Sequence, residues 1–116
     1  MIVRVTRATV AKDREAEAFA MLRKLADGIG RPTGMDAMHI ARRTEGRAVQ
    51  LIAVTVWQDM GSLQAATGPG WQAASFAPEL DALLTDASVE HYETVVDVFE
   101  DLESVGLGSG SAKATA

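Results

Sequence analysis

The chain contains no cysteine among its 116 residues. Disulfide bonds, thiolate catalysis and cysteine-based zinc sites are therefore excluded. It also contains no asparagine, and aromatic residues make up only 5% of it. Basic residues are few, because 11 lysines and arginines face 16 acidic residues and leave a formal net charge of −5. This charge argues against nucleic acid, which requires a basic face, and against an anionic membrane surface as a partner.

Long apolar runs are missing as well. No run approaches the roughly 18 residues that a membrane-spanning helix needs. Residues 1–7 are interrupted by arginine and lack the continuous apolar stretch of a signal peptide, so we expect a cytoplasmic protein. Hydrophobic residues make up 47% of the chain and charged residues 23%, which is ordinary for a globular protein. The length suits one domain with one core.

The first third of the chain predicts a strand followed by a helix. Residues 2–10 are rich in β-branched types and contain no breaker, which indicates a strand. Asp13 is placed to cap the helix that follows. Apolar residues at helical spacing form one stripe on this helix: Phe19, Leu22, Leu25, Ala26 and Ile29. Gly28, Gly30 and Pro32 then end the helix.

The middle of the chain predicts a hairpin and a second helix. Residues 35–44 and 49–58 read as two strands, and the Glu-Gly-Arg sequence at 45–47 joins them as a turn. Asp59 can cap a helix that ends near Thr67, where a Gly-Pro-Gly sequence breaks it.

The last third predicts two short helical stretches and a fourth strand. One stretch covers about 71–76, the next begins at Pro78, and the strand covers 88–98. The order β-α-β-β-α-β predicts an α+β domain of ferredoxin-like topology with a four-stranded antiparallel sheet. This domain should occupy residues 1–103, and the Gly-, Ser- and Ala-rich residues 104–116 should form a flexible tail.

The third strand is apolar on both faces. In residues 49–57 one set of alternate side chains holds Val, Leu, Ala, Thr and Trp, and the other set includes Ile and two Val. Both helices of a split β-α-β sheet fall on one face, so the other face has no cover within the chain. A second copy would cover it, and we expect a homodimer. The alternative is a monomer whose far face is more polar.

Two segments carry a family resemblance. Residues 32–36 (PTGMD) enter the second strand, and residues 54–63 (VTVWQDMGSL) run from the third strand into the second helix. Trp57 ends the third strand, and the Gly-Pro-Gly turn at 68–70 follows the helix. In these features, over about residues 1–100, the chain resembles the antibiotic biosynthesis monooxygenase superfamily. The resemblance implies a dimeric α/β barrel of ferredoxin-like topology.

The resemblance leaves the activity open. The superfamily includes cofactor-independent oxygenases of aromatic polyketides, haem-degrading oxygenases, isomerases and members without known activity. Its haem degraders use an Asn on the first strand, the Trp that ends the third strand and a His on the second helix. This chain has no Asn, and Ala66 stands where the family often has that His, so only Trp57 matches. Haem binding or degradation by this constellation is therefore disfavoured.

Two hypotheses remain, one enzymatic and one non-enzymatic. The first is a cofactor-independent monooxygenase acting on a small aromatic or polyketide-like substrate. The second is a non-catalytic dimer of the same fold that binds a small hydrophobic ligand, which the missing Asn favours. With no Cys and no His-x-x-x-His or His-Glu-x-x-His spacing, we expect neither a metal nor another cofactor.

A cofactor-free oxygenase needs a base, a cation or donor for the resulting anion, and a dry apolar cavity. The candidate catalytic residues are His39 on the second strand and His91 on the fourth, which could line one cavity. The candidate substrate-binding residues are Trp57, Trp71, Phe76, Tyr92 and Arg4. For the aromatic residues the alternative role is core packing, for the histidines a structural hydrogen bond, and for Arg4 a solvated position at the sheet edge.

Overall fold

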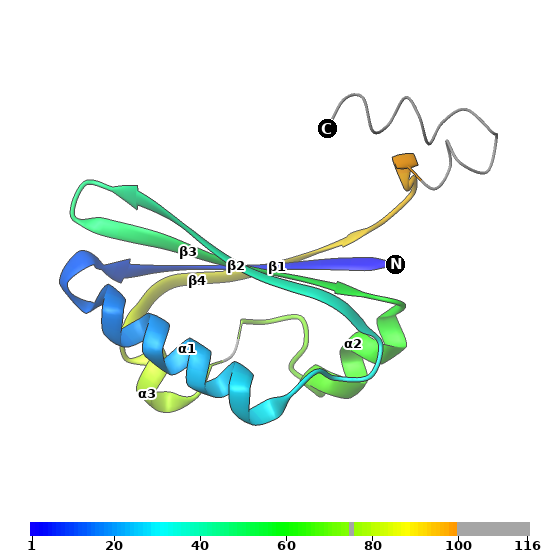
Figure 1. Cartoon of the computed structure of the whole chain (residues 1–116), viewed down its shortest axis with the longest axis horizontal. Helices are drawn as coiled ribbons and strands as arrows, with labels where there is room; N and C mark the ends of the chain where they lie inside the picture. Colours follow the sequence, from blue (N-terminus) through cyan, green and yellow to red (C-terminus); the bar gives the residue numbers. More distant parts are fainter. Residues whose placement is uncertain (75, 100–116) are drawn as a thin grey trace.

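The computed structural model describes residues 1–74 and 76–99. The chain forms a four-stranded antiparallel sheet with its helices on one face (Figure 1), which confirms the ferredoxin-like β-α-β-β-α-β topology. The strands lie in the order β2-β3-β1-β4 and are β1 (Ile2–Ala11), β2 (Met35–Glu45), β3 (Ala48–Trp57) and β4 (Leu84–Glu93). The helices are the short η1 (Lys12–Arg14), α1 (Glu15–Ile29), α2 (Met60–Thr67) and α3 (Pro78–Asp81).

β1 lies at the centre of the sheet, between β3 and β4. Its register places Arg4 opposite Thr55 of β3 on one side and opposite His91 of β4 on the other. Alternate side chains of a strand point to opposite faces. The helix-facing set on β1 is therefore Ile2, Arg4, Thr6, Ala8 and Val10, of which the first and the last two are buried.

The hydrophobic core on the helix face is divided in two. One cluster of buried residues lies under α1 and α3 and consists of Val10, Ala18, Val49, Leu51 and Leu80. The other lies beside α2 and consists of Ile2, Trp57 and Leu63. Between them the central strands present the short side chains Thr6, Ala53 and Thr55. Small residues in the middle of the sheet leave a gap in the core.

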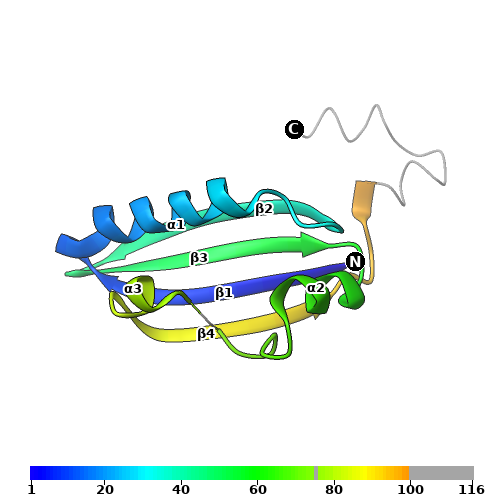
Figure 2. The same cartoon turned by 90° about the horizontal axis from the view of Figure 1, so that it is seen from below.

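The helices are spread over the sheet so that this gap remains partly uncovered. Figure 2 shows α1 along the β2 side of the sheet and α2 and α3 along the side of β1 and β4. Leu25 was expected in the apolar stripe of α1, but 37% of it is exposed. It borders the gap instead of packing in either core cluster. Within the described residues, no helix has the length and apolar character to span a membrane.

The predicted N-terminal cap is found on α2 but not on α1. The side chain of Asp59 accepts a hydrogen bond from the Ser62 amide at 2.7 Å, which confirms it as the cap of α2. Asp13 does not cap α1, and that prediction is wrong. The chain leaves β1 through η1, so α1 begins only at Glu15 with Arg14 at the N-cap position and no side-chain cap.

Two boundaries near the C-terminus also differ from the prediction. Residues 71–74 form turns rather than a helix, with the Trp71 amide bonded to the Gly68 carbonyl at 3.2 Å. β4 covers Leu84–Glu93 rather than the predicted 88–98, because pairing with β1 sets its bounds. Glu93 lies opposite Ile2, which begins β1. The predicted tail at 104–116 lies outside the described residues.

The sheet face opposite the helices is uncovered. The register gives it a centre of apolar side chains: Val3, Val5, Ile52, Val54 and Val56. Within the described residues no element packs over this face (Figure 1). The apolar character of both faces of β3, read from the sequence, thus corresponds to one face under helices and one face without cover.

Gly34, just before β2, lies against Ser62 in the first turn of α2, and substitutions there test how closely the two segments pack. It has a φ of 85°, and a Cβ at this position would overlap the side chain of Ser62. Gly46, in the hairpin turn, has a φ of 60° and open space around it. We expect Gly46→Ala to cost about 1 to 2 kcal/mol from backbone strain alone. Gly34→Ala should cost about 1 to 3 kcal/mol more because of the overlap.

Urea unfolding followed by circular dichroism measures both losses. Adding Ser62→Gly to Gly34→Ala should recover the part of the loss that the overlap causes. Equal losses for the two glycine variants would contradict the close packing of Gly34 against α2.

Candidate functional site

A pocket of about 350 Å³ opens in the gap between the two core clusters. This volume lies within the range of small-molecule sites in proteins. The central strands contribute Arg4, Thr6, Ala53, Thr55 and Trp57. The rest of the wall comes from α1, the entry to β2, the end of α2 and the segment before α3: Leu22, Leu25, Ala26, Gly30, Pro32, Met35, Met38, Ala66, Thr67 and Phe76.

Trp57, a candidate substrate-binding residue, forms one end of the pocket. Only 2% of it is exposed, and it packs with Ile2 and Leu63. Its indole Nε1 donates a hydrogen bond to the Thr55 hydroxyl at 2.9 Å. The polar edge of the ring is therefore satisfied inside the protein, and the ring offers the ligand an apolar surface.

Arg4 is the one charged side chain among the described residues that line the pocket. Its Nη1 donates to the Trp71 carbonyl at 2.6 Å and lies 3.1 Å from His91 Nε2. An arginine nitrogen can only donate, so His91 must accept through Nε2 and carry its proton on Nδ1. Burial lowers the pKa of Arg4.

His91 and Trp71 stand behind Arg4 rather than in the pocket wall. Their rings meet edge to face, with centroids 5.0 Å apart and an interplanar angle of 75°. Burial, and then the charge of Arg4, lower the pKa of His91. The imidazole is thus held neutral, which is the form that can accept the hydrogen bond from Arg4.

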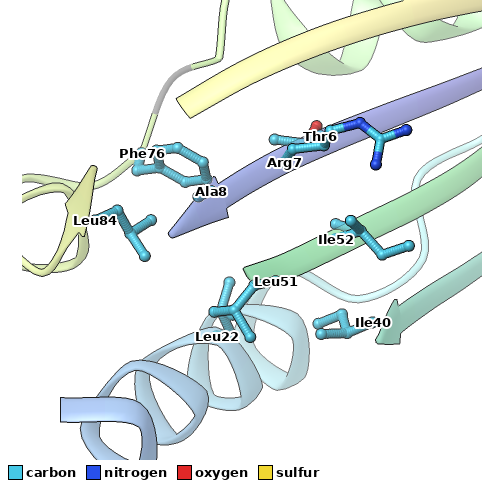
Figure 3. A pocket seen from close by; sticks show the side chains of 10 residues that line it. Thr6, Arg7, Ala8, Leu22, Ile40, Leu51, Ile52, Phe76 and Leu84 are labelled. Carbon is cyan, nitrogen blue, oxygen red and sulfur yellow. The ribbon is translucent and has the colours of Figure 1, made fainter. Parts of the chain in front are cut away.

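Phe76 lines the pocket and also a smaller apolar cavity of about 30 Å³ beside it. Thr6, Leu22 and Ala53 likewise line both spaces. Figure 3 shows Phe76 over β1 near Ala8, with side chains of α1 and β3 on the other side of the small cavity. The small cavity extends the pocket toward the core under α1, and its apolar lining favours a dry interior.

His39 does not lie in the pocket. It faces Val54 on the uncovered side of the sheet and is exposed, because its neighbours Met38 and Ile40 take the helix-facing positions of β2. His91 lies on the helix side. The expectation that the two histidines line one cavity is therefore wrong. A bulge between Met35 and Ala37 shifts the alternation of β2, so sequence parity could not assign the face.

Tyr92 also lies on the uncovered side, where half of it is exposed. Its hydroxyl donates to Glu90 at 2.5 Å, and Arg7 donates to the same carboxylate at 3.1 Å. The Tyr92 hydrogen bond, followed by that of Arg7, lowers the pKa of Glu90. The hydrogen bond to Glu90 raises the pKa of Tyr92. The two sides of β1 thus carry separate polar groups, one at Arg4 and one at Arg7.

Several wall residues were not singled out from the sequence, above all Thr55, Met35 and Met38. The signal that could have found Thr55 is the run of small residues at helix-facing positions in the middle of β1 and β3. Ala66 lines the pocket, so no imidazole reaches it from α2.

No protein-family model matches the chain, and no curated protein matches it. Among solved structures, it is similar to the haem degrader MhuD from Mycobacterium tuberculosis with two haems in its active site. The identity is 24%, the match covers 84% of this chain and 99% of that one, and the TM-score is 0.62.

Two further structures are similar to the chain. One is a Deinococcus radiodurans protein assigned to the antibiotic biosynthesis monooxygenases, with 16% identity, coverage of 84% and 96%, and a TM-score of 0.64. The other is a variant of SnoaB, a cofactor-independent oxygenase from Streptomyces nogalater, with 22% identity, coverage of 84% and 95%, and a TM-score of 0.58. These likenesses show that the chain has the fold expected from its resemblance to the antibiotic biosynthesis monooxygenase superfamily.

The lowered pKa of His91 predicts a pH dependence of stability. As the pH falls, the unfolded imidazole takes up its proton near its ordinary pKa of 6.5, before the folded one does. Stability should therefore fall as the pH drops through 6.5, and this fall ends below the folded pKa. His91→Gln should remove this part of the fall, while its amide oxygen can still accept the Arg4 hydrogen bond.

Thermal unfolding between about pH 8 and about pH 5 measures the effect, in a range above the titration of most carboxylates. His39→Gln is the matched control, because it removes an exposed imidazole from the other face of the sheet and should keep the wild-type profile. A His91→Gln profile that follows the wild type throughout would refute the assignment of a neutral, partly buried His91.

Proposed function

We propose that the chain is a cofactor-independent monooxygenase-like protein that oxidises a small aromatic or polyketide-like substrate in the pocket beside Trp57, and that it works as a homodimer. The observation that carries the proposal is the pocket itself, which is apolar except for one cation, Arg4, and the hydroxyls of threonine. A flat ring fits between aromatic and aliphatic walls of this kind. The fold shared with SnoaB, a cofactor-independent oxygenase, supports the same reading.

The chemistry requires an acidic substrate. A phenol or enol that loses a proton becomes an anion that can give electrons to O₂, and a methylene carbon, CH₂, then becomes a carbonyl with release of one water. One oxygen atom of O₂ enters the carbonyl and the other leaves as water, so the reaction needs no further reductant. Arg4 would stabilise the anion. The dry walls would protect the oxygenated intermediate from water.

His91 is the stronger of the two base candidates, since His39 faces away from the pocket. Its neutral imidazole has a lone pair on Nε2, which faces Arg4 Nη1 at 3.1 Å. When Arg4 turns toward a substrate anion, this lone pair becomes free to accept the substrate proton. His91 would then act from behind Arg4 rather than from the pocket wall.

Oxygen uptake with a panel of anthrones and polyphenols tests the activity. We expect turnover by the wild type without added metal or flavin, and a loss of about 10²- to 10³-fold in kcat for Arg4→Gln, as for removal of one anion-stabilising donor. Arg7→Gln is the matched control, because it removes an arginine from the other face of the same strand.

The outcome separates the alternatives. Binding of panel members without any oxygen uptake would favour the non-catalytic ligand-binding dimer. Haemin titration tests haem binding, which the similarity to a haem degrader with two haems in its active site suggests and which Ala66 in the pocket wall disfavours. We expect no shift of the haemin Soret band.

The uncovered sheet face supports the homodimer. Its apolar residues lie side by side on β1 and β3, unlike the scattered single hydrophobic residues of ordinary surfaces. A second sheet would remove them from water. The chain after β4 leaves on this same side (Figure 1) and exposes apolar side chains: Val95, Val96, Val98 and Phe99. A symmetric pair of sheets is the simplest arrangement that covers both surfaces.

Light scattering after size-exclusion chromatography tests the dimer. We expect the wild type at twice the mass of one chain. Val54→Glu should shift it toward the mass of a single chain, because this side chain lies opposite Val5 at the centre of the uncovered face. Gln50→Glu, nearer the end of the same face, should remain dimeric. A wild type with the mass of a single chain would exclude this interface.

A further inference from the structure

Among the arginines whose contacts the structure describes, Arg4 alone combines partial burial with the lack of a carboxylate partner; Arg31 also donates only to carbonyls, but it is exposed. Arg7, Arg14, Arg42 and Arg43 each form an ion pair with a glutamate, at exposed positions. Arg4 is partly buried, and within residues 1–74 and 76–99 its hydrogen bonds go to a carbonyl and an imidazole, with no carboxylate among them. A cation that is taken out of water without a counter-ion is unfavourable, so its position has a cost that a bound anion would offset.

The Arg4 guanidinium is held in place, but not all of its nitrogen atoms take part in hydrogen bonds. Both of its hydrogen bonds involve Nη1, which leaves Nη2 and Nε without a partner among the described residues. The Trp71 carbonyl and His91 fix one corner of the fork, and the same side chain forms part of the pocket wall. A planar fork fixed at one corner still offers donors for an oxyanion.

We propose that Arg4 is an anion subsite, and that the pocket selects flat apolar ligands that already carry an ionised oxygen group on the ring, either a carboxylate or an acidic phenolate. This inference deepens the proposed function, because it places the anion in the same pocket, but it concerns binding and does not require turnover. For binding, Trp71 and His91 act as positioning residues, since they contact Arg4 and are not part of the pocket wall; the proton transfer proposed above for His91 is a separate step that begins when Arg4 turns to the bound anion.

The competing role for Arg4 is purely structural. Its hydrogen bond to the Trp71 carbonyl ties the turn after α2 to the sheet, across 67 positions of sequence. If that were its whole role, the charge of a ligand in the pocket would make no difference to its affinity. Two pairs of ligands with nearly the same shape and different charge can separate the two roles.

Isothermal titration calorimetry with anthracene carboxylate and anthracene carboxamide makes the first comparison. Picrate and trinitroanisole make the second, and show whether a phenolate serves as well as a carboxylate. We expect the acid of at least one pair to bind about tenfold or more tightly than its neutral partner, as for one charge-assisted hydrogen bond. Arg4→Gln should abolish this preference for the acid over its neutral partner.

Arg4→Lys and Arg7→Gln complete the design. Lysine keeps the charge without the fork, so part of the preference should remain, while Arg7→Gln should keep all of it. Equal affinities within both pairs, no binding of either acid, or an undiminished preference in Arg4→Gln would overturn the proposal. The wild-type comparison decides it even if Arg4→Gln does not fold. A preference for the acids without oxygen uptake would support the subsite and reject the oxygenase.

Discussion

The antiparallel pairing of β1 with β3 is the interaction on which the rest of the structure depends. It aligns Ile2 with Trp57 at one end and Val10 with Val49 at the other, and both ends become core. Between them it aligns positions with short side chains, which leave the space beneath the helices unfilled at the centre of the sheet. The pocket is therefore a consequence of where large and small residues fall in one ladder, and Arg4 lies at its edge.

Much of the fold could be predicted from the sequence, because helix caps and turns are determined by residues that lie close together in the chain. The Asp59 cap and the 45–47 turn each depend on residues only a few positions apart. The bounds of β4 and the face of His39 depend on pairing with distant strands and on a bulge, which no short window of sequence contains. The site was predicted only in part for the same reason: Arg4 and Trp57 were identified by type and position, whereas their assembly with Thr55 needed the register.

The charge of the pocket and the charge of the chain have opposite signs. The chain carries a formal charge of −5, but the one charged side chain among the described wall residues is an arginine. An acidic surface repels an anionic ligand at long range, and salt screens that repulsion beyond about 10 Å. Discrimination by the proposed subsite must therefore act at contact distance, where a desolvated guanidinium is strongest. The neutral state of His91 matters here, because an imidazolium could not accept the hydrogen bond that holds Arg4 in place.

The alternation along β1 also constrains how such a protein can change during evolution. Neighbouring residues of this strand serve different surfaces: Arg4 and Thr6 border the pocket, whereas Val3 and Val5 belong to the uncovered face. Inserting or deleting one residue in the strand would exchange the two sets and place valines in the pocket and arginine on the opposite side. Point substitutions can change either surface alone, whereas changes of length are expected outside the central strands, as in the hairpin turn at Gly46, which has open space around it.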